Sequence, residues 1–243
     1  MNSRKNKRRF FAVILASLLA MSASVCARAE MPSNVYFSCH TDRKLIALTF
    51  DDGPHPRYTP AILDVLDKYG IRATFFMVGE NISLYSEVAK EVVARGHEIG
   101  NHTESHPPVR KRSDMELKEE ILTAEKKIET LTGKKPTVFR PPEGLCPERI
   151  GRIAGGLGYT VILWTVDTRD WAATPSKQIV QNVTAKVKNG DILLFHDYVS
   201  YENTTIRAIE EIIPRLLKEG YTFVTVPELL EEEERYLQSR AVS

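Results

Sequence analysis

Short apolar runs alternate along this chain with longer segments in which apolar residues recur every three or four positions. The short runs are rich in β-branched and aromatic residues and are bounded by turn residues, which is typical of strands. The longer segments have the period of helices with one buried face. The predicted strands span residues 45–50, 73–78, 97–100, 137–139, 160–165, 191–195 and 221–225.

The helical segments carry recognisable start and stop signals. Thr59, which precedes a proline, predicts an N-cap, and Gly70 predicts the end of the same helix. Ser113 and Glu116 have the spacing of a capping box ahead of an apolar stripe that Gly133 closes. These signals support a strict alternation of strand and helix.

Seven βα units in a row predict an α/β fold with a parallel sheet and helices packed outside it. The number of strands favours an irregular parallel (β/α) barrel with about seven βα units. A doubly wound open sheet is the alternative. A chain of 243 residues suits one such domain, predicted at 44–243 after a short N-terminal segment at 30–43.

The first 29 residues have the layout of a secretory signal peptide. Five Lys and Arg residues precede an apolar run at 10–20, and Ala27-Arg28-Ala29 has the A-x-A pattern of a cleavage site. The apolar run is short for a membrane-spanning helix. We therefore expect a secreted or cell-envelope protein without a stable membrane span, and an uncleaved anchor is the alternative.

Charge and cysteine content narrow the possible partners. Removal of 1–29 takes six Lys/Arg and no Asp/Glu, which moves the formal net charge from +1 to about −5 and gives no support for nucleic-acid binding. The acidic run at 231–234 is interpreted as the solvated end of the last helix. Cys39 and Cys146 either pair or stay free, and free thiols are favoured. A monomer is expected.

Unusual polar residues follow one predicted strand after another. In parallel barrels the carboxyl ends of the strands form the face that carries the active site. Independent surface residues would not be expected to gather there. The residues in question are Asp51 and Asp52, His102 and His106, Arg140, Asp167, Asp170 and Trp171, and His196 and Asp197.

The spacing of these residues predicts a metal site. Two adjacent carboxylates such as Asp51 and Asp52 resist joint ionisation unless a cation compensates them. His102 and His106 are four residues apart, and Pro107 favours a loop there. With one carboxylate they make a three-ligand set that leaves positions open for water and substrate. The alternatives are a polar turn and loop histidines bonded to backbone.

The remaining polar residues each have two interpretations. Arg140 is held rigidly by two prolines, which suits a cation that fixes a carboxylate, and the alternative is a surface arginine. Trp171 is either a pocket wall for a sugar ring or a core residue. His196 is either a buried core histidine or a titrating acid beside a metal.

In order along the chain stand Thr49-Phe50-Asp51-Asp52-Gly53-Pro54, His102-Thr103-Glu104-Ser105-His106, Arg140-Pro141-Pro142-Glu143-Gly144, Asp167-Thr168-Arg169-Asp170-Trp171 and Leu194-Phe195-His196. These segments resemble the five motifs of the polysaccharide deacetylase family (NodB-homology domain, carbohydrate esterase family 4). The resemblance covers roughly residues 44–230. It implies an irregular (β/α) barrel, a divalent metal that is usually zinc, and removal of acetyl groups from carbohydrate.

The resemblance also implies a role for each residue. Asp51 would be the general base, paired with Arg140, and His196 the general acid. Asp170 would orient His196, with Asp167 as its rival for that role. The implied metal ligands are Asp52, His102 and His106. The implied substrate-binding residues are Pro142, Glu143, Gly144, Trp171 and Leu194, the last two lining the groove for the acetyl methyl.

The third motif departs from the family pattern at one position. The family usually has an aromatic residue after the two prolines, and this chain has Glu143. Any residue except proline can supply the backbone N–H that the family uses there in an oxyanion hole. The carboxylate would instead contact sugar hydroxyls or the amine formed on deacetylation.

The expected activity is metal-assisted hydrolysis of N-acetyl groups on N-acetylated amino sugars. Peptidoglycan is the first candidate substrate, chitin oligosaccharides the second and acetylxylan, an ester, the third. A non-catalytic glycan-binding relative is the alternative from another class. A phosphoesterase on a barrel would need more positive charge near the metal than Arg140 supplies.

Overall fold

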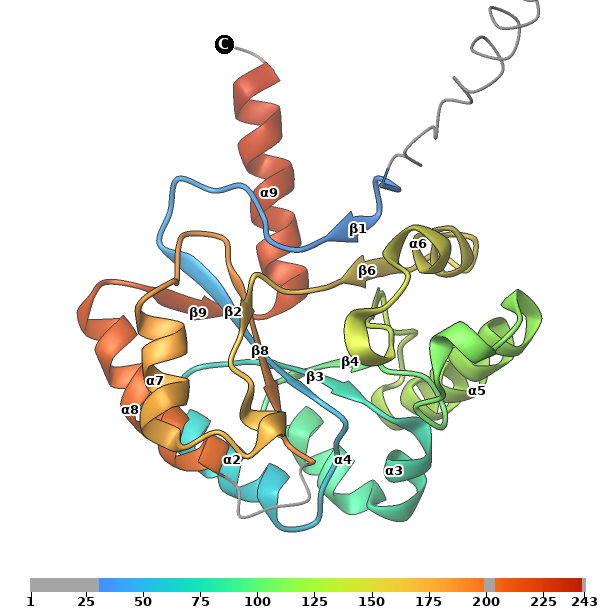
Figure 1. Cartoon of the computed structure of the whole chain (residues 1–243), viewed down its shortest axis with the longest axis horizontal. Coiled ribbons are helices and arrows are strands. Elements are labelled where there is room, and N and C mark those ends of the chain that lie inside the picture. Colours follow the sequence, from blue (N-terminus) through green and yellow to red (C-terminus); the bar gives the residue numbers. More distant parts are fainter. Residues whose placement is uncertain (1–30, 199–203, 242–243) are drawn as a thin grey trace, which may run out of the picture. The chain divides into compact units, whose positions relative to one another are not determined.

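A parallel β-sheet runs through the part of the chain that the computed structural model describes, residues 31–198 and 204–241, and helices lie outside it (Figure 1). The predicted signal peptide at 1–29 lies outside the described residues. The strands are β1 (Val35–Tyr36), β2 (Leu45–Asp51), β3 (Thr74–Met77), β4 (Glu98–Asn101), β5 (Val138–Phe139), β6 (Thr160–Ile162), β7 (Val166–Asp167), β8 (Ile192–His196) and β9 (Thr222–Val224).

The order of the strands identifies a barrel. It is β1-β6-β5-β4-β3-β2-β8-β7, with every ladder parallel and β9 paired to the first half of β2. β6 and β7 are consecutive in the chain but lie towards opposite ends of this order, so the sheet curls round and is interrupted between them. The prediction of an irregular parallel barrel is confirmed, and the doubly wound alternative is wrong.

Helices connect most of the successive strands. They are α2 (Tyr58–Tyr69), α3 (Gly79–Leu84), α4 (Ser86–Ala94), α5 (Asp114–Thr132), α6 (Pro147–Gly155), α7 (Ser176–Thr184), α8 (Thr204–Lys218) and α9 (Val226–Ala241). Short 3-10 turns occupy η1 (Val109–Lys111), η2 (Pro142–Gly144) and η3 (Asp170–Ala172). Within the described residues, no helix is both long and apolar enough to cross a membrane.

Most of the predicted helix boundaries are present. Ser113 and Glu116 form a complete capping box at α5, and Gly133 ends that helix in the left-handed conformation. Gly70 ends α2 in the same way. A residue without Cβ adopts this conformation at no steric cost, which is why glycine marked both ends in the sequence.

Thr59 is not an N-cap, and that prediction is wrong. α2 begins at Tyr58 with Arg57 at the capping position. The Thr59 hydroxyl accepts the His55 backbone N–H and donates to a carboxylate oxygen of Asp197 at 2.6 Å. It therefore braces a loop from a distant part of the chain, a contact that local sequence does not reveal.

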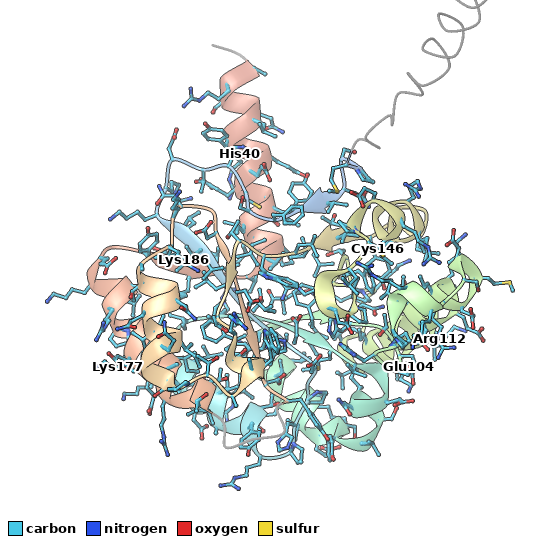
Figure 2. All side chains as sticks on the ribbon, in the orientation of Figure 1. His40, Glu104, Arg112, Cys146, Lys177 and Lys186 are labelled. Atoms are coloured by element: carbon cyan, nitrogen blue, oxygen red, sulfur yellow. The ribbon has the colours of Figure 1, made fainter. Side chains whose placement is uncertain are left out.

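The acidic run at 231–234 is also not simply a solvated helix end. Glu232 and Glu233 are buried. Glu232 accepts hydrogen bonds from Arg43 and Arg235, and Glu233 lies 2.7 Å from Nδ1 of His40 on the segment beside α9 (Figure 2). The run thus ties α9 to the chain segment ahead of β2.

Both described cysteines are free thiols, as favoured from the sequence. Cys39 is buried and Cys146 is half-buried at the start of α6. Burial, together with the neighbouring charge of Glu233, raises the pKa of Cys39 far above its ordinary value. A thiol held neutral in this way is unreactive.

β2 is the centre of the core. All seven of its residues are buried, and it pairs with β3, β8 and β9. The Phe50 ring packs on Phe75 at 5.0 Å and on Phe195 at 5.8 Å between centroids. Asp51, the last residue of this strand, is therefore held by the most rigid part of the fold.

The close contact between β3 and β4 gives a test of the packing. A Cβ added to Gly100 would overlap the Phe76 ring. We expect Gly100→Ala to lower the free energy of unfolding by about 1–3 kcal/mol, because a packed core yields only at the cost of strain. Urea denaturation would measure it.

Gly156→Ala is the matched control. Gly156 has φ −64°, and the nearest atom to its added Cβ is 3.4 Å away. The free energy of unfolding of the Gly156→Ala variant should stay within about 0.5 kcal/mol of the parent value. Equal stability of the two variants would contradict the packing described for Gly100.

Candidate active site

A cavity of about 530 Å³ lies at the carboxyl ends of the strands, where the sequence predicted a site. β2, β7 and β8 deliver residues to it directly, and the loops after β2, β4, β5, β6 and β7 supply the rest. Its lining is Asp51, Asp52, His102, His106, Glu143, Leu145, Trp164, Asp167, Trp171, Leu194 and His196. Residues from well-separated parts of the sequence thus share one chamber.

Asp52, His102 and His106 form a compact set of possible metal ligands. Oδ1 of Asp52 lies 3.3 Å from Nε2 of His102 and 3.4 Å from Nε2 of His106. One ligand atom from each residue lies within 4.8 Å of the others. Three such ligands leave the remaining positions open, which is the pattern of a catalytic metal site.

The orientation of His102 fits a cation. Its Nδ1 lies 2.7 Å from the Arg140 carbonyl, which can only accept, so Nδ1 carries the proton and donates it. The lone pair of Nε2 then faces the Asp52 carboxylate. Two acceptors at this distance need a proton or a cation between them. A divalent ion therefore fits the residues present, with the carbonyl fixing the imidazole tautomer.

In the metal-free chain, charge interactions also favour the ionised form of Asp52. Burial raises the pKa of Asp52, but its hydrogen bond to His102 and the nearby histidine charges outweigh burial and lower that pKa to about 2. Asp52 is therefore ionised across the physiological range, as a metal ligand must be.

The loop that carries the two histidines is held by α5. Glu120 accepts the backbone N–H groups of Glu104 and Ser105 and the Ser105 hydroxyl. Both Thr103 and His106 have positive φ, at 70° and 51°. For residues other than glycine such conformations cost free energy, and they persist where the surrounding structure imposes them. The predicted loop, rather than a helix, is present at His106.

Asp51 is paired with a fully buried arginine. Nη1 of Arg140 donates to Oδ1 of Asp51 at 2.7 Å and to the Thr49 hydroxyl at 2.8 Å. Oδ2 of Asp51 lies 3.8 Å from Nε2 of His102. One carboxylate oxygen is thus committed to Arg140, and the other faces the metal ligands.

The other Arg140 donors are also used. Nε and Nη2 donate to the Ile162 and Leu163 carbonyls, and the guanidinium lies 4.1 Å from the centroid of the Phe76 ring. With its donors fixed on three sides, the guanidinium cannot leave Asp51 without exposing buried polar groups.

His196 is oriented by Asp170. Nδ1 of His196 lies 2.8 Å from Oδ1 of Asp170, whose Oδ2 accepts the His196 backbone N–H and the Thr205 hydroxyl. Burial lowers the pKa of His196, but the hydrogen bond and charge of Asp170 outweigh burial and raise that pKa to about 9. The imidazole is therefore protonated at neutral pH.

Asp167 has a different position. Its Oδ1 accepts the backbone N–H of Arg169 and, at 3.3 Å, Nε1 of Trp171. The sequence did not decide which of the two aspartates lies beside His196. The structure places Asp170 there and Asp167 on the cavity wall.

The sequence placed Asp197 after the sixth predicted strand but indicated no role for it. Its carboxylate is fully buried, accepts the Thr59 hydroxyl and occupies the space that a Cβ on Gly53 would need. Its backbone N–H donates to the Asp51 carbonyl at 3.2 Å. Asp197 therefore joins the loops after β2 and β8. The only signal in the sequence was its place next to His196.

A protein-family model described as polysaccharide deacetylase matches residues 39–162. The chain belongs to the polysaccharide deacetylase family.

Related proteins are carbohydrate deacetylases. A peptidoglycan-N-acetylglucosamine deacetylase of Bacillus cereus is 42% identical over 203 residues, covering 83% of this chain and 91% of that protein. A chitooligosaccharide deacetylase of a Bradyrhizobium strain is 34% identical over 196 residues, covering 76% and 90%. The crystal structure of the Bc1960 peptidoglycan N-acetylglucosamine deacetylase superposes with a TM-score of 0.78 at 35% identity, covering 81% and 92%.

The substrate-binding residues that the polysaccharide deacetylase motifs suggested are partly in the cavity wall. Glu143, Trp171 and Leu194 line it, whereas Pro142 and Gly144 are the ends of the short turn η2. Trp164, which sequence reasoning did not single out, also lines the cavity and packs against Gly144.

Asp170→Asn tests the electrostatic pairing with His196. Without the carboxylate charge of Asp170, burial is opposed only by the more distant charges of Asp52 and Asp51, and we expect the His196 pKa to fall well below about 9. NMR titration of the imidazole in the metal-free protein would measure this.

Asp167→Asn is the control for that titration. Because Asp167 bonds to Arg169 and Trp171, its loss should leave the His196 pKa nearly unchanged. A larger shift with Asp167→Asn than with Asp170→Asn would contradict the pairing.

Proposed function

We propose that this chain is an exported, zinc-dependent hydrolase that removes N-acetyl groups from the amino sugars of a polysaccharide, with peptidoglycan as the first candidate. One observation carries the proposal. A carboxylate paired with the buried Arg140 and an imidazole held protonated by Asp170 line the same cavity as a three-ligand metal set.

Asp52, His102 and His106 would hold the ion, and a mixed nitrogen and oxygen ligand set suits zinc. A divalent ion held there supplies Lewis acidity, which polarises a carbonyl and makes water easier to deprotonate. The backbone N–H of Glu143 is the proposed further donor to the oxyanion.

Asp51 is the proposed general base. Its Oδ1 accepts a hydrogen bond from Arg140, and its Oδ2 faces the metal ligands. A base in this position takes a proton from the attacking water. Asp52, whose oxygen lies between two imidazoles, cannot serve as both ligand and base.

His196 is the proposed general acid. An amine is a poor leaving group unless its nitrogen is protonated, and the raised pKa of His196 keeps a proton available at neutral pH. Because the pKa is raised, this proton is present below about pH 9 and is lost as the pH rises through that value. An intact acid favours amide over ester substrates.

The proposed substrate follows from the relatives and from the segment ahead of the domain. The peptidoglycan deacetylase of Bacillus cereus is similar over most of both chains. Export through residues 1–29 would bring the enzyme to the cell wall. Similarity to a chitooligosaccharide deacetylase supports chitin-like oligosaccharides as the second candidate. A non-catalytic glycan-binding role would not require base, acid and ligands together.

Acetate release tests the activity directly. The chain lacking residues 1–29 should release acetate from peptidoglycan or chitin oligosaccharides, lose this activity with a chelator and regain it with Zn²⁺, because ligands without an ion cannot supply Lewis acidity. Acetylxylan serves as the ester comparison. If metal-loaded protein releases no acetate from any of them, the glycan-binding alternative replaces the enzyme.

Asp51→Asn tests whether Asp51 acts as the base while Asp52 acts as a metal ligand. Loss of the base should lower kcat about 10²–10⁴-fold. The metal ligands are untouched, so the metal content by mass spectrometry should stay at the parent level. Near-full activity with metal bound would show that Asp51 is not the base.

A further inference from the structure

Glu143 places an unpaired carboxylate in the wall of the cavity. Its side chain is exposed and belongs to the lining. Across residues 31–198 and 204–241, no hydrogen bond or ion pair of this carboxylate is found. A substrate that enters the cavity therefore meets a full negative charge there.

The backbone fixes the position from which the Glu143 side chain extends. Glu143 has φ 58° and ψ 6°, and Gly144 follows with φ 63°. The Trp164 indole packs so closely on Gly144 that a Cβ there would lie 2.5 Å from a ring carbon. The turn is thus held between the buried Pro142 and Trp164. Trp164 and Trp171 supply the aromatic walls of the cavity, and Glu143 adds a charged side chain to it.

The other carboxylates that line the cavity have partners, whereas Glu143 has none in the part of the chain that the structure describes. Asp51 is paired with Arg140, and Asp52 faces the two histidines. Asp167 accepts two N–H groups.

No Lys or Arg is among the residues that line the described cavity. The guanidinium of Arg169 stacks on the Trp171 ring, 5.8 Å from its centroid, and does not belong to the lining. Glu143 is therefore the one carboxylate in the described lining that has neither a cation nor an N–H donor as a partner.

We propose that Glu143 determines specificity by charge, so that the cavity accepts an acetamido sugar with neutral substituents and disfavours one that carries a carboxylate. In glycan strands without stem peptides this selects N-acetylglucosamine over N-acetylmuramic acid, whose free lactyl carboxylate is anionic. The inference rests on the proposed deacetylase function. Two like charges a few ångströms apart near a protein surface repel enough to change kcat/KM roughly three- to tenfold.

The decisive variant is Glu143→Gln, which removes the charge and keeps the side-chain size and the backbone N–H. Three oligosaccharides serve as substrates: one of N-acetylglucosamine, one containing N-acetylmuramic acid, and the latter with its lactyl carboxylate converted to the carboxamide. Glu143→Gln should raise kcat/KM for the carboxylate form about three- to tenfold. The values for the other two substrates should change by the same factor as each other, because neither of them carries a charge.

Glu119→Gln is the matched control, since Glu119 is exposed on α5 and does not line the cavity. It should leave all three values unchanged. High salt should reduce the parent preference, because screening weakens the repulsion. The inference is overturned if Glu143→Gln leaves the ratio of carboxylate to carboxamide substrate unchanged, or if Glu119→Gln changes it equally.

A binding measurement separates this inference from the proposed function. In the Asp51→Asn background, the dissociation constants of the carboxylate and carboxamide oligosaccharides give the same ratio without catalysis. If no acetate is released but Glu143→Gln still changes this ratio, the hydrolase proposal fails and the charge selectivity stands. If acetate is released but Glu143→Gln changes neither the kcat/KM ratio nor the ratio of dissociation constants, the charge selectivity fails and the hydrolase proposal stands.

Discussion

The site depends on one buried residue, Arg140. Its side chain holds Asp51 through Nη1, and its backbone carbonyl accepts the Nδ1 proton of His102. The same residue therefore pairs with the proposed base and orients a proposed metal ligand. A buried ion pair is costly to form, and removal of either partner leaves an uncompensated charge. Bonds to the Ile162 and Leu163 carbonyls fix the guanidinium, so the end of β6 also contributes to this geometry.

The sequence predicts the barrel and the site face because both follow from short-range patterns. Each of the seven predicted strands is present, since buried parallel strands are continuous apolar runs bounded by turn residues. Parallel topology then brings their carboxyl ends together. β1 and β7 were not predicted, because two-residue strands have no period to detect. Thr59 and Glu232 were misread because their partners are far away in the sequence.

The choice between Asp167 and Asp170 shows where sequence reasoning stops. Both follow the same predicted strand, and both are carboxylates near a tryptophan. The backbone separates them, because Arg169 adopts φ 61° and ψ 25° and η3 begins at the next residue. This turn carries Asp170 to His196 and leaves Asp167 facing Trp171. A left-handed arginine is uncommon, and no local pattern announces it.

Because the charged residues of the site occur in compensating pairs, the charge of Glu143 in the cavity wall can influence which sugar binds. Arg140 neutralises Asp51, Asp170 stabilises the imidazolium of His196, and the histidines with a cation balance Asp52. A substrate therefore meets an interior whose formal charges largely cancel. An uncompensated carboxylate at Glu143 acts against this balanced background, so a change in its charge alters which sugar enters while the base, the acid and the ligands stay in place.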